Sequence, residues 1–211
     1  MSIVLEPARE GHSAPVRIVM LAPAYSSPED FVAAGFASAV RTRRLAIDLV
    51  FARLEARHLG DETLPAQVWE LAGPRATATR LWLGGISLGG YLALCAAQSN
   101  SQALAGLCLL APYLGSYIVV NEVARAGLER WEPAPLAGDD DERRLWRFLQ
   151  SRPAGLAIHL GLGRDDRFSA RHRVLADALP PEEVDTIPGG HDWPTWQRLW
   201  ENFLDARFAS H

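Results

Sequence analysis

The chain has 211 residues, of which 48% are apolar and 22% are charged, and this suits one globular domain, 1–211, with a sizeable core. A net charge of -4 gives no reason to expect nucleic acid or an acidic membrane surface as a partner. With only two cysteines, a disulfide framework is not expected. No apolar stretch reaches membrane-spanning length, and the N-terminus lacks signal-peptide features, so we expect a cytoplasmic protein.

Short apolar runs alternate with helix-favouring segments along most of the chain. The expected strands are 3–5, 16–22, 45–50, 81–84, 104–110, 155–163 and 184–187. The expected helices are 31–40, 62–72, 91–97, 170–179 and an amphipathic one through 196–204. This alternation predicts an α/β fold, a mostly parallel sheet with helices on both faces, and ligands bound beyond the carboxyl ends of the strands.

The alternation stops between residues 112 and 152. This segment contains two expected helices and a proline-rich turn between them: 117–128, 141–150 and 131–135. The acidic run 139–141 is better explained as the start of the second helix than as a binding motif. We expect the segment to form a helical lid over the site. Its aromatic residues could line a pocket or belong to the core: Tyr113, Tyr117 and Trp131.

The sequence Gly-Ile-Ser-Leu-Gly at 85–89 stands between an expected strand and an expected helix. It has the G-x-S-x-G form, in which a sharp turn lifts the serine hydroxyl above the end of the sheet. Gly85 and Gly89 have no Cβ, so strand and helix can approach closely around Ser87. The N–H of Leu88, at the start of the helix, would point at a negative oxygen formed on a substrate attacked by Ser87.

A serine hydroxyl needs a base to become a good nucleophile, and His191 is the candidate. It follows the last expected strand and two glycines, which let its ring turn toward the sheet. A carboxylate must orient this ring, and Asp165 and Asp166 compete for that role, with the spacing from Gly163 favouring Asp166. Asp192 is adjacent to His191 in the chain, so capping of the last helix suits it better.

The order Ser87, Asp166, His191 resembles that of the α/β-hydrolase superfamily. Three motifs carry the resemblance: the serine turn at 85–89, Gly-Arg-Asp-Asp at 163–166, and Gly-Gly-His-Asp-Trp-Pro at 189–194, which is similar to the histidine loop of small bacterial esterase-like members. The resemblance implies an α/β-hydrolase fold and hydrolysis of a small-molecule ester or thioester through an acyl-enzyme, with no cofactor and no metal. Trp193, beside the histidine, is a candidate substrate-binding residue.

In this superfamily the loop after an early strand supplies a second donor to the oxyanion. Here Ala22-Pro23-Ala24 stands where the usual pattern has His-Gly or Pro-Gly before the donor. The N–H of Ala24 is the candidate donor, with Tyr25 beside it as an alternative and a candidate substrate contact. The same residues could equally form a simple turn between strand and helix.

Three functions are compatible with these residues. The first is a serine hydrolase that cleaves carboxylic esters of small to medium acyl groups. The second is a thioesterase or acyltransferase on carrier-bound or CoA-bound acyl groups, because the triad sets the chemistry but not the acceptor. The third is a hydrolase-fold protein that binds a partner without catalysis. The sequence leaves the substrate and the oligomeric state open.

His159 lies among apolar neighbours in the expected strand 155–163, outside all of these motifs. We expect it to be a buried structural histidine.

Overall fold

The computed structural model describes residues 1–9, 11–54, 63–73, 79–133 and 140–209. Within these residues, seven strands form one sheet in the order β1-β3-β2-β4-β5-β6-β7. The strands are β1 Ser2–Glu6, β2 Val16–Leu21, β3 Ile47–Arg53, β4 Arg80–Ile86, β5 Gly106–Leu110, β6 Ala157–Gly163 and β7 Val184–Ile187. Only β1, at one edge, pairs antiparallel, with β3; the other pairs are parallel.

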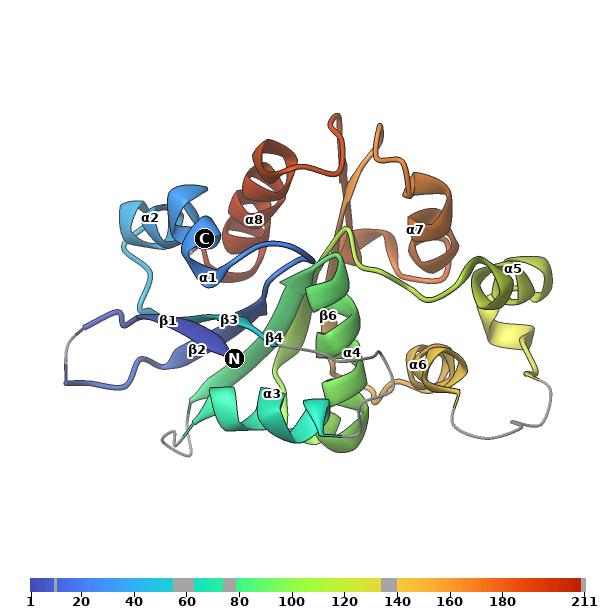
Figure 1. Cartoon of the computed structure of the whole chain (residues 1–211), viewed down its shortest axis with the longest axis horizontal. Coiled ribbons are helices and arrows are strands. Elements are labelled where there is room, and N and C mark those ends of the chain that lie inside the picture. The colour runs from blue at the N-terminus through green and yellow to red at the C-terminus, as the bar shows by residue number, and fades with distance from the viewer. Residues whose placement is uncertain (10, 55–62, 74–78, 134–139, 210–211) are drawn as a thin grey trace.

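The helices cover both faces of the sheet. They are α1 Pro28–Ala33, α2 Phe36–Thr42, α3 Leu64–Ala72, α4 Leu88–Asn100, α5 Tyr117–Ala126, α6 Asp141–Gln150, α7 Ser169–Ala176 and α8 Trp193–Phe208. Helices α1, α2 and α8 lie on one face, and α3 and α4 lie on the other (Figure 1). The predicted α/β architecture, mostly parallel with helices on both faces, is confirmed.

Alternation within the strands explains this two-sided core. In β2, Val19 and Leu21 belong to the cluster on the α3–α4 face, whereas Ile18 and Met20 belong to the cluster under α1, α2 and α8. Successive side chains of a strand point to opposite faces, so a parallel strand covered on both sides must be apolar throughout. This is why the strand signals are continuous apolar runs.

The helix predicted at 31–40 is wrong in one respect, because it is two helices. Gly35 adopts a φ of 88° between α1 and α2, in the left-handed region that glycine enters without strain. The break lets the ring of Phe31 stack on Phe51 and the ring of Phe36 stack on Trp200, with centroid distances of 4.8 and 5.3 Å. Burying both rings outweighs the continuous helix that the local sequence favours.

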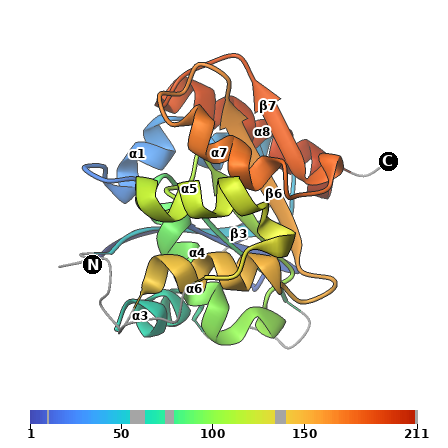
Figure 2. The same cartoon turned by 90° about the vertical axis from the view of Figure 1, so that its right-hand side faces the viewer.

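The segment predicted as a lid packs beside the sheet. Helix α5 lies between α7 and α6, and α6 also contacts α4 (Figure 2). Trp146 of α6 is fully buried in the core cluster on the α3–α4 face of the sheet, and its Nε1–H donates to the Leu114 carbonyl at 2.9 Å. Asp140 caps α6 by accepting from the Arg143 N–H, as the acidic run predicts. Asp139 and the end of the proline-rich turn lie outside the described residues.

Candidate active site

The turn between β4 and α4 holds Ser87 in a strained conformation, with φ 52° and ψ -115°. Glycine is required on both sides of it. A Cβ at Gly85 would lie 2.3 Å from the carbonyl carbon of Gly89, and a Cβ at Gly89 would lie 2.0 Å from the Leu21 oxygen. The backbone of Ser87 is fixed from the next strand, since its N–H donates to the Leu110 carbonyl at 3.0 Å.

Three side chains from distant segments form one hydrogen-bonded row at this turn. The His191 Nε2 lies 3.1 Å from the Ser87 Oγ, and the His191 Nδ1 lies 2.7 Å from an Asp166 carboxylate oxygen. Ser87 follows β4, Asp166 follows β6 and His191 follows β7. The carboxyl ends of parallel strands lie at one edge of a sheet, so the three residues meet there. The structure therefore brings together the serine, imidazole and carboxylate that the sequence singles out.

Asp166 is built to stay ionised. Its side chain is inaccessible to solvent and accepts the Phe168 N–H at 2.7 Å as well as the bond with His191. Burial by itself raises the pKa of a carboxyl, but these two hydrogen bonds and the nearby His172 hold the pKa of Asp166 below its ordinary value. A buried carboxylate in this position fixes the tautomer of His191 and stabilises its protonated form.

The neighbouring carboxylates have other partners. Asp165 accepts the Gly189 N–H at 3.0 Å, which ties the loop after β6 to the loop after β7. Asp192 accepts the Thr195 N–H at 3.0 Å and caps α8, as predicted. Asp166 is thus the carboxylate that contacts His191, which decides between the two candidates in geometric terms.

Two aromatic rings pack against the His191 ring. Those of Phe168 and Trp196 form T-shaped pairs with it, with centroid distances of 5.1 and 5.0 Å. The loops that carry Asp166 and His191 also touch, because a Cβ at Gly163 would lie 2.4 Å from the Gly189 oxygen. Sequence analysis did not assign roles to Phe168 and Trp196, although Phe168 stands two residues after the carboxylate and Trp196 stands in the same helix turn as Trp193.

Leu88 and Ala24 both lie beside Ser87, and their backbone N–H groups have no acceptor in the part of the chain described here. Leu88 is the first residue of α4, where N–H groups have no partner within the helix. The turn at Ala24 is closed by a bond from the Ser26 N–H to the Pro23 carbonyl at 3.3 Å. Next to it, Tyr25 has a φ of 64° and a fully exposed side chain.

An open, largely aromatic hollow of about 720 Å³ surrounds Ser87. It is lined by Pro23, Ala24, Tyr25, Ser26, Ser87, Leu88, Tyr113, Arg167, Phe168, His191, Asp192, Trp193, Pro194 and Trp196. The predicted contacts Tyr25, Tyr113 and Trp193 are among these residues, and Arg167 is the lining cation that sequence analysis missed.

Two predicted aromatic residues lie elsewhere. Tyr117 is 65% exposed, and the guanidinium of Arg171 lies 5.7 Å from its ring centroid. Trp131 is buried in the core cluster beside α6. Neither residue lines the hollow. Of the described part of 112–152, Tyr113 alone lines it, so a role of this segment as a lid stays a prediction.

Tyr113 is anchored to the segment that follows it. Its hydroxyl donates to the Glu142 carboxylate at 3.1 Å, and its backbone N–H donates to the Ser87 carbonyl at 2.9 Å. Burial, and then the Glu142 carboxylate, raise the pKa of Tyr113 to about 12, so the phenol stays protonated at neutral pH. Tyr113 therefore lines the hollow with its ring, and its hydroxyl can donate to a ligand there only if the bond to Glu142 is broken.

Across the described residues, no group of three or more histidine, cysteine, aspartate or glutamate side chains is arranged to hold a metal ion. A separate search of the same residues finds no helix of the length and apolar character needed to cross a membrane.

Comparison with solved structures identifies the fold. The chain is similar to the fluorophosphonate-binding serine hydrolase FphF from Staphylococcus aureus, with 12% identity, a TM-score of 0.65 and coverage of 92% of this chain and 84% of that one. For an S-formylglutathione hydrolase from Agrobacterium tumefaciens, the identity is 13% and the TM-score 0.64, over 99% and 90% of the two chains. Est1E from Butyrivibrio proteoclasticus is also similar, with 16% identity, a TM-score of 0.61 and coverage of 99% of this chain and 94% of that one.

No protein-family model matches the chain, and no curated protein matches its sequence. The class that the fold defines is nevertheless clear: the chain has the α/β-hydrolase fold.

Proposed function

We propose that this protein is a serine hydrolase that cleaves carboxylic esters of small to medium acyl groups. One observation carries the proposal: the uninterrupted row from Asp166 through His191 to the Ser87 hydroxyl, at 2.7 and 3.1 Å. The strained backbone of Ser87 and the unpaired N–H groups beside it support the same reading, because such features reduce the stability of a fold and are concentrated at functional sites.

The reaction follows from this geometry. His191 removes the proton of Ser87 as the hydroxyl oxygen attacks the ester carbonyl, and Asp166 stabilises the imidazolium that forms. The N–H groups of Leu88 and Ala24 hold the oxyanion of the tetrahedral intermediate. His191 then gives the proton to the leaving alcohol, and water repeats the sequence on the acyl-enzyme. This mechanism requires no cofactor.

The test is the variant Ser87→Ala, assayed with a p-nitrophenyl ester and with a fluorophosphonate probe. Turnover should fall by about four orders of magnitude or more, and labelling should disappear, because the attacking oxygen is gone. Ser38→Ala is the matched control, since Ser38 is an exposed serine whose hydroxyl donates to the Gly35 carbonyl. Labelling of Ser87→Ala at the wild-type level would remove Ser87 from the mechanism, and absence of labelling in the folded wild type would favour a non-catalytic binding protein.

A second candidate is a thioesterase that uses the same three residues. It has support because two of the similar structures are named S-formylglutathione hydrolases, whose name specifies a formyl group on sulfur. Turnover of matched acyl thioesters and oxygen esters decides between the two. A kcat/KM for the thioester more than about tenfold above that for the oxygen ester, after correction for the uncatalysed rates, would favour the second candidate.

A further inference from the structure

One wall of the hollow carries positive charge. Arg167 lines the hollow and follows Asp166 directly in the chain. Its guanidinium lies 4.8 Å from the centroid of the Phe168 ring, and that of Arg171 lies 5.7 Å from the same centroid. Phe168 in turn meets the His191 ring edge-on, so the two guanidinium groups are tied to the triad through one aromatic side chain.

Neither arginine is neutralised by a carboxylate from the described residues. Elsewhere the chain pairs its structural arginines closely: Arg43 with Asp205 at 2.6 Å, and Arg143 with both Glu122 and Asp140. In the described part of the chain, the guanidinium groups of Arg167 and Arg171 instead lie over aromatic rings, and neither forms an ion pair with a carboxylate. Stacking on a ring leaves the N–H groups of a guanidinium, which lie in its plane, available to an anion.

The acidic groups at the hollow do not cancel this charge. Asp166 is buried, and its charge is used by His191 and the Phe168 N–H. Asp192 lines the hollow on the side of α8, where it caps that helix. A carboxylate at a helix N-terminus is offset by the positive end of the helix dipole. The positive charge on the Phe168 side of the hollow is therefore not cancelled by these two carboxylates.

We propose that Arg167 binds a carboxylate of the substrate, so that the preferred substrate is an ester carrying a free carboxylate in addition to the bond that is cleaved. This inference rests on the proposed function and names its substrate class. A planar guanidinium binds a carboxylate through two parallel N–H bonds, and the aromatic lining accommodates the apolar remainder of the substrate. Because the Arg167 guanidinium lies over the Phe168 ring, the carboxylate would bind on the Phe168 side of the hollow.

The experiment compares two pairs of esters. In the first, the acyl group carries the charge: mono(4-nitrophenyl) adipate against 4-nitrophenyl hexanoate. In the second, the leaving group carries it: 4-carboxyphenyl hexanoate against its methyl ester. The wild type should favour the charged member of at least one pair in kcat/KM, and the pair that shows the preference identifies the side of the scissile bond on which the carboxylate is bound.

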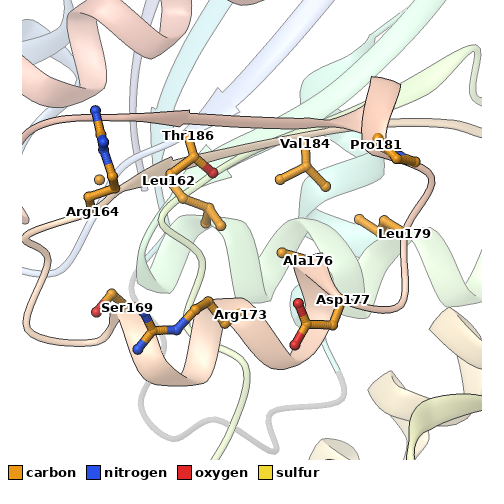
Figure 3. Close-up of a pocket in the computed structure, with 11 residues that line it drawn as sticks. Leu162, Arg164, Ser169, Arg173, Ala176, Asp177, Leu179, Pro181, Val184 and Thr186 are labelled. Carbon is orange, nitrogen blue, oxygen red and sulfur yellow. The ribbon is translucent and has the colours of Figure 1, made fainter.

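The variant Arg167→Gln should reduce the charged-to-neutral ratio of kcat/KM about tenfold, mainly through KM, and Arg167→Lys should restore part of it. Raising the salt concentration from about 0.02 to about 0.5 M should weaken the wild-type preference. The matched control is Arg164→Gln, which removes the same charge from the same loop. Arg164 lines a separate cavity of about 680 Å³ at the ends of β6 and β7 and helix α7, and its guanidinium points away from α7 (Figure 3).

The outcomes separate the two proposals. If the wild type cleaves neutral esters but shows no preference for the charged member of either pair, the carboxylate site is wrong and the hydrolase proposal stands. If Arg167→Gln and Arg164→Gln change the ratio equally, the preference is a general charge effect and the assignment to Arg167 fails. If the wild type cleaves no ester or thioester, the proposed function itself fails. A thermal unfolding midpoint close to that of the wild type shows that Arg167→Gln is folded.

Discussion

The edge of the sheet at Ser87 and the helical segment around α5 and α6 are built in opposite ways. At the edge, Ser87 and Tyr25 have positive φ angles, and Leu88 and Ala24, which line the hollow, have backbone N–H groups without an acceptor among the described residues. In the segment, Gln150 of α6 donates to the carbonyls of Leu128 and Trp131 at 2.7 and 3.0 Å. Backbone N–H groups thus lack a hydrogen-bond partner at the edge, whereas backbone carbonyls in the segment have one.

This difference separates stability from chemistry. Unpaired donors and strained backbone reduce the stability of a fold, and they persist where the surrounding structure can hold them. The segment supplies such support. Tyr113 at its start donates its N–H to the Ser87 carbonyl, and the buried Trp146 donates to the carbonyl of the next residue, Leu114. We therefore expect changes at the edge to abolish activity with little effect on stability, and changes in the segment to do the reverse.

The largest effect is expected at the edge, for Asp166→Asn. An amide can still accept the Phe168 N–H, but it no longer stabilises the protonated His191 or selects the tautomer that accepts from Ser87. We expect kcat to fall about 10⁴-fold, which corresponds to about 5 kcal/mol in the barrier, with a nearly unchanged unfolding temperature. Steady-state kinetics on a p-nitrophenyl ester and thermal unfolding measure the two quantities.

Asp165→Asn is the matched control, because this carboxylate is adjacent in the chain and accepts the Gly189 N–H instead. It should retain activity within about tenfold of the wild type, since its hydrogen bond positions only a loop. Equal losses in the two variants would mean that the loop as a whole, and not the bond between Asp166 and His191, is what activity depends on.

The second prediction concerns the segment. Trp146→Ala removes a fully buried ring and should lower the free energy of unfolding by about 4 kcal/mol. Trp146→Phe keeps most of the ring and removes the bond to the Leu114 carbonyl, so it should cost about 1 to 2 kcal/mol. Urea denaturation gives both values, and kcat, assayed well below the unfolding temperature, should stay within a few fold of the wild type. A loss of kcat comparable to that of Asp166→Asn would contradict the division between edge and segment.

The third prediction is a pH dependence of stability from His159, which lies in β6 away from both regions. Burial, and then the charge of Arg207, lower the pKa of His159 from 6.5 to about 4. Below pH 6.5 the unfolded chain takes up a proton that the folded chain does not, so the free energy of unfolding falls as the pH drops toward 4. His159→Leu should reduce the loss between about pH 7 and pH 4.5 by about 2 kcal/mol.

Urea denaturation at several pH values checks this prediction. His172 is also buried, and burial lowers its pKa to about 4 as well, so part of the acid sensitivity should remain in the variant. An identical pH dependence in wild type and His159→Leu would show that His159 does not contribute. Because His159 does not line the hollow, activity at neutral pH should change little.

Local patterns were sufficient to predict the sheet and the turn at Ser87. Apolar runs mark strands buried on both faces, and the two glycines around Ser87 follow from a clash that any side chain would cause. Local patterns failed at Gly35, where the sequence favours one helix. The break depends on Phe51 and Trp200, which are distant in sequence and stack on the rings at either side of it.

The direction of side chains was the second feature that local patterns could not predict. The spacing favoured Asp166 over Asp165, but only the contact of Asp165 with the Gly189 N–H explains why the two neighbours point apart. Tyr113 and Tyr117 looked equivalent as pocket residues, yet the first lines the hollow and the second lies exposed beside Arg171. Arg167 was overlooked because nothing in its local sequence distinguishes a cation over an aromatic ring from an ordinary surface arginine.

Residue type and spacing along the chain were enough to predict the order of strands and helices and to single out the serine, histidine and carboxylate candidates. Three features became visible only in the folded chain: the carboxylate that contacts His191, the aromatic residues around Ser87, and the position of Arg167 in the hollow. Those features depend on distances between remote segments, such as those of Ser87 and His191, which are 104 residues apart, and such distances are set by the packing of the whole sheet.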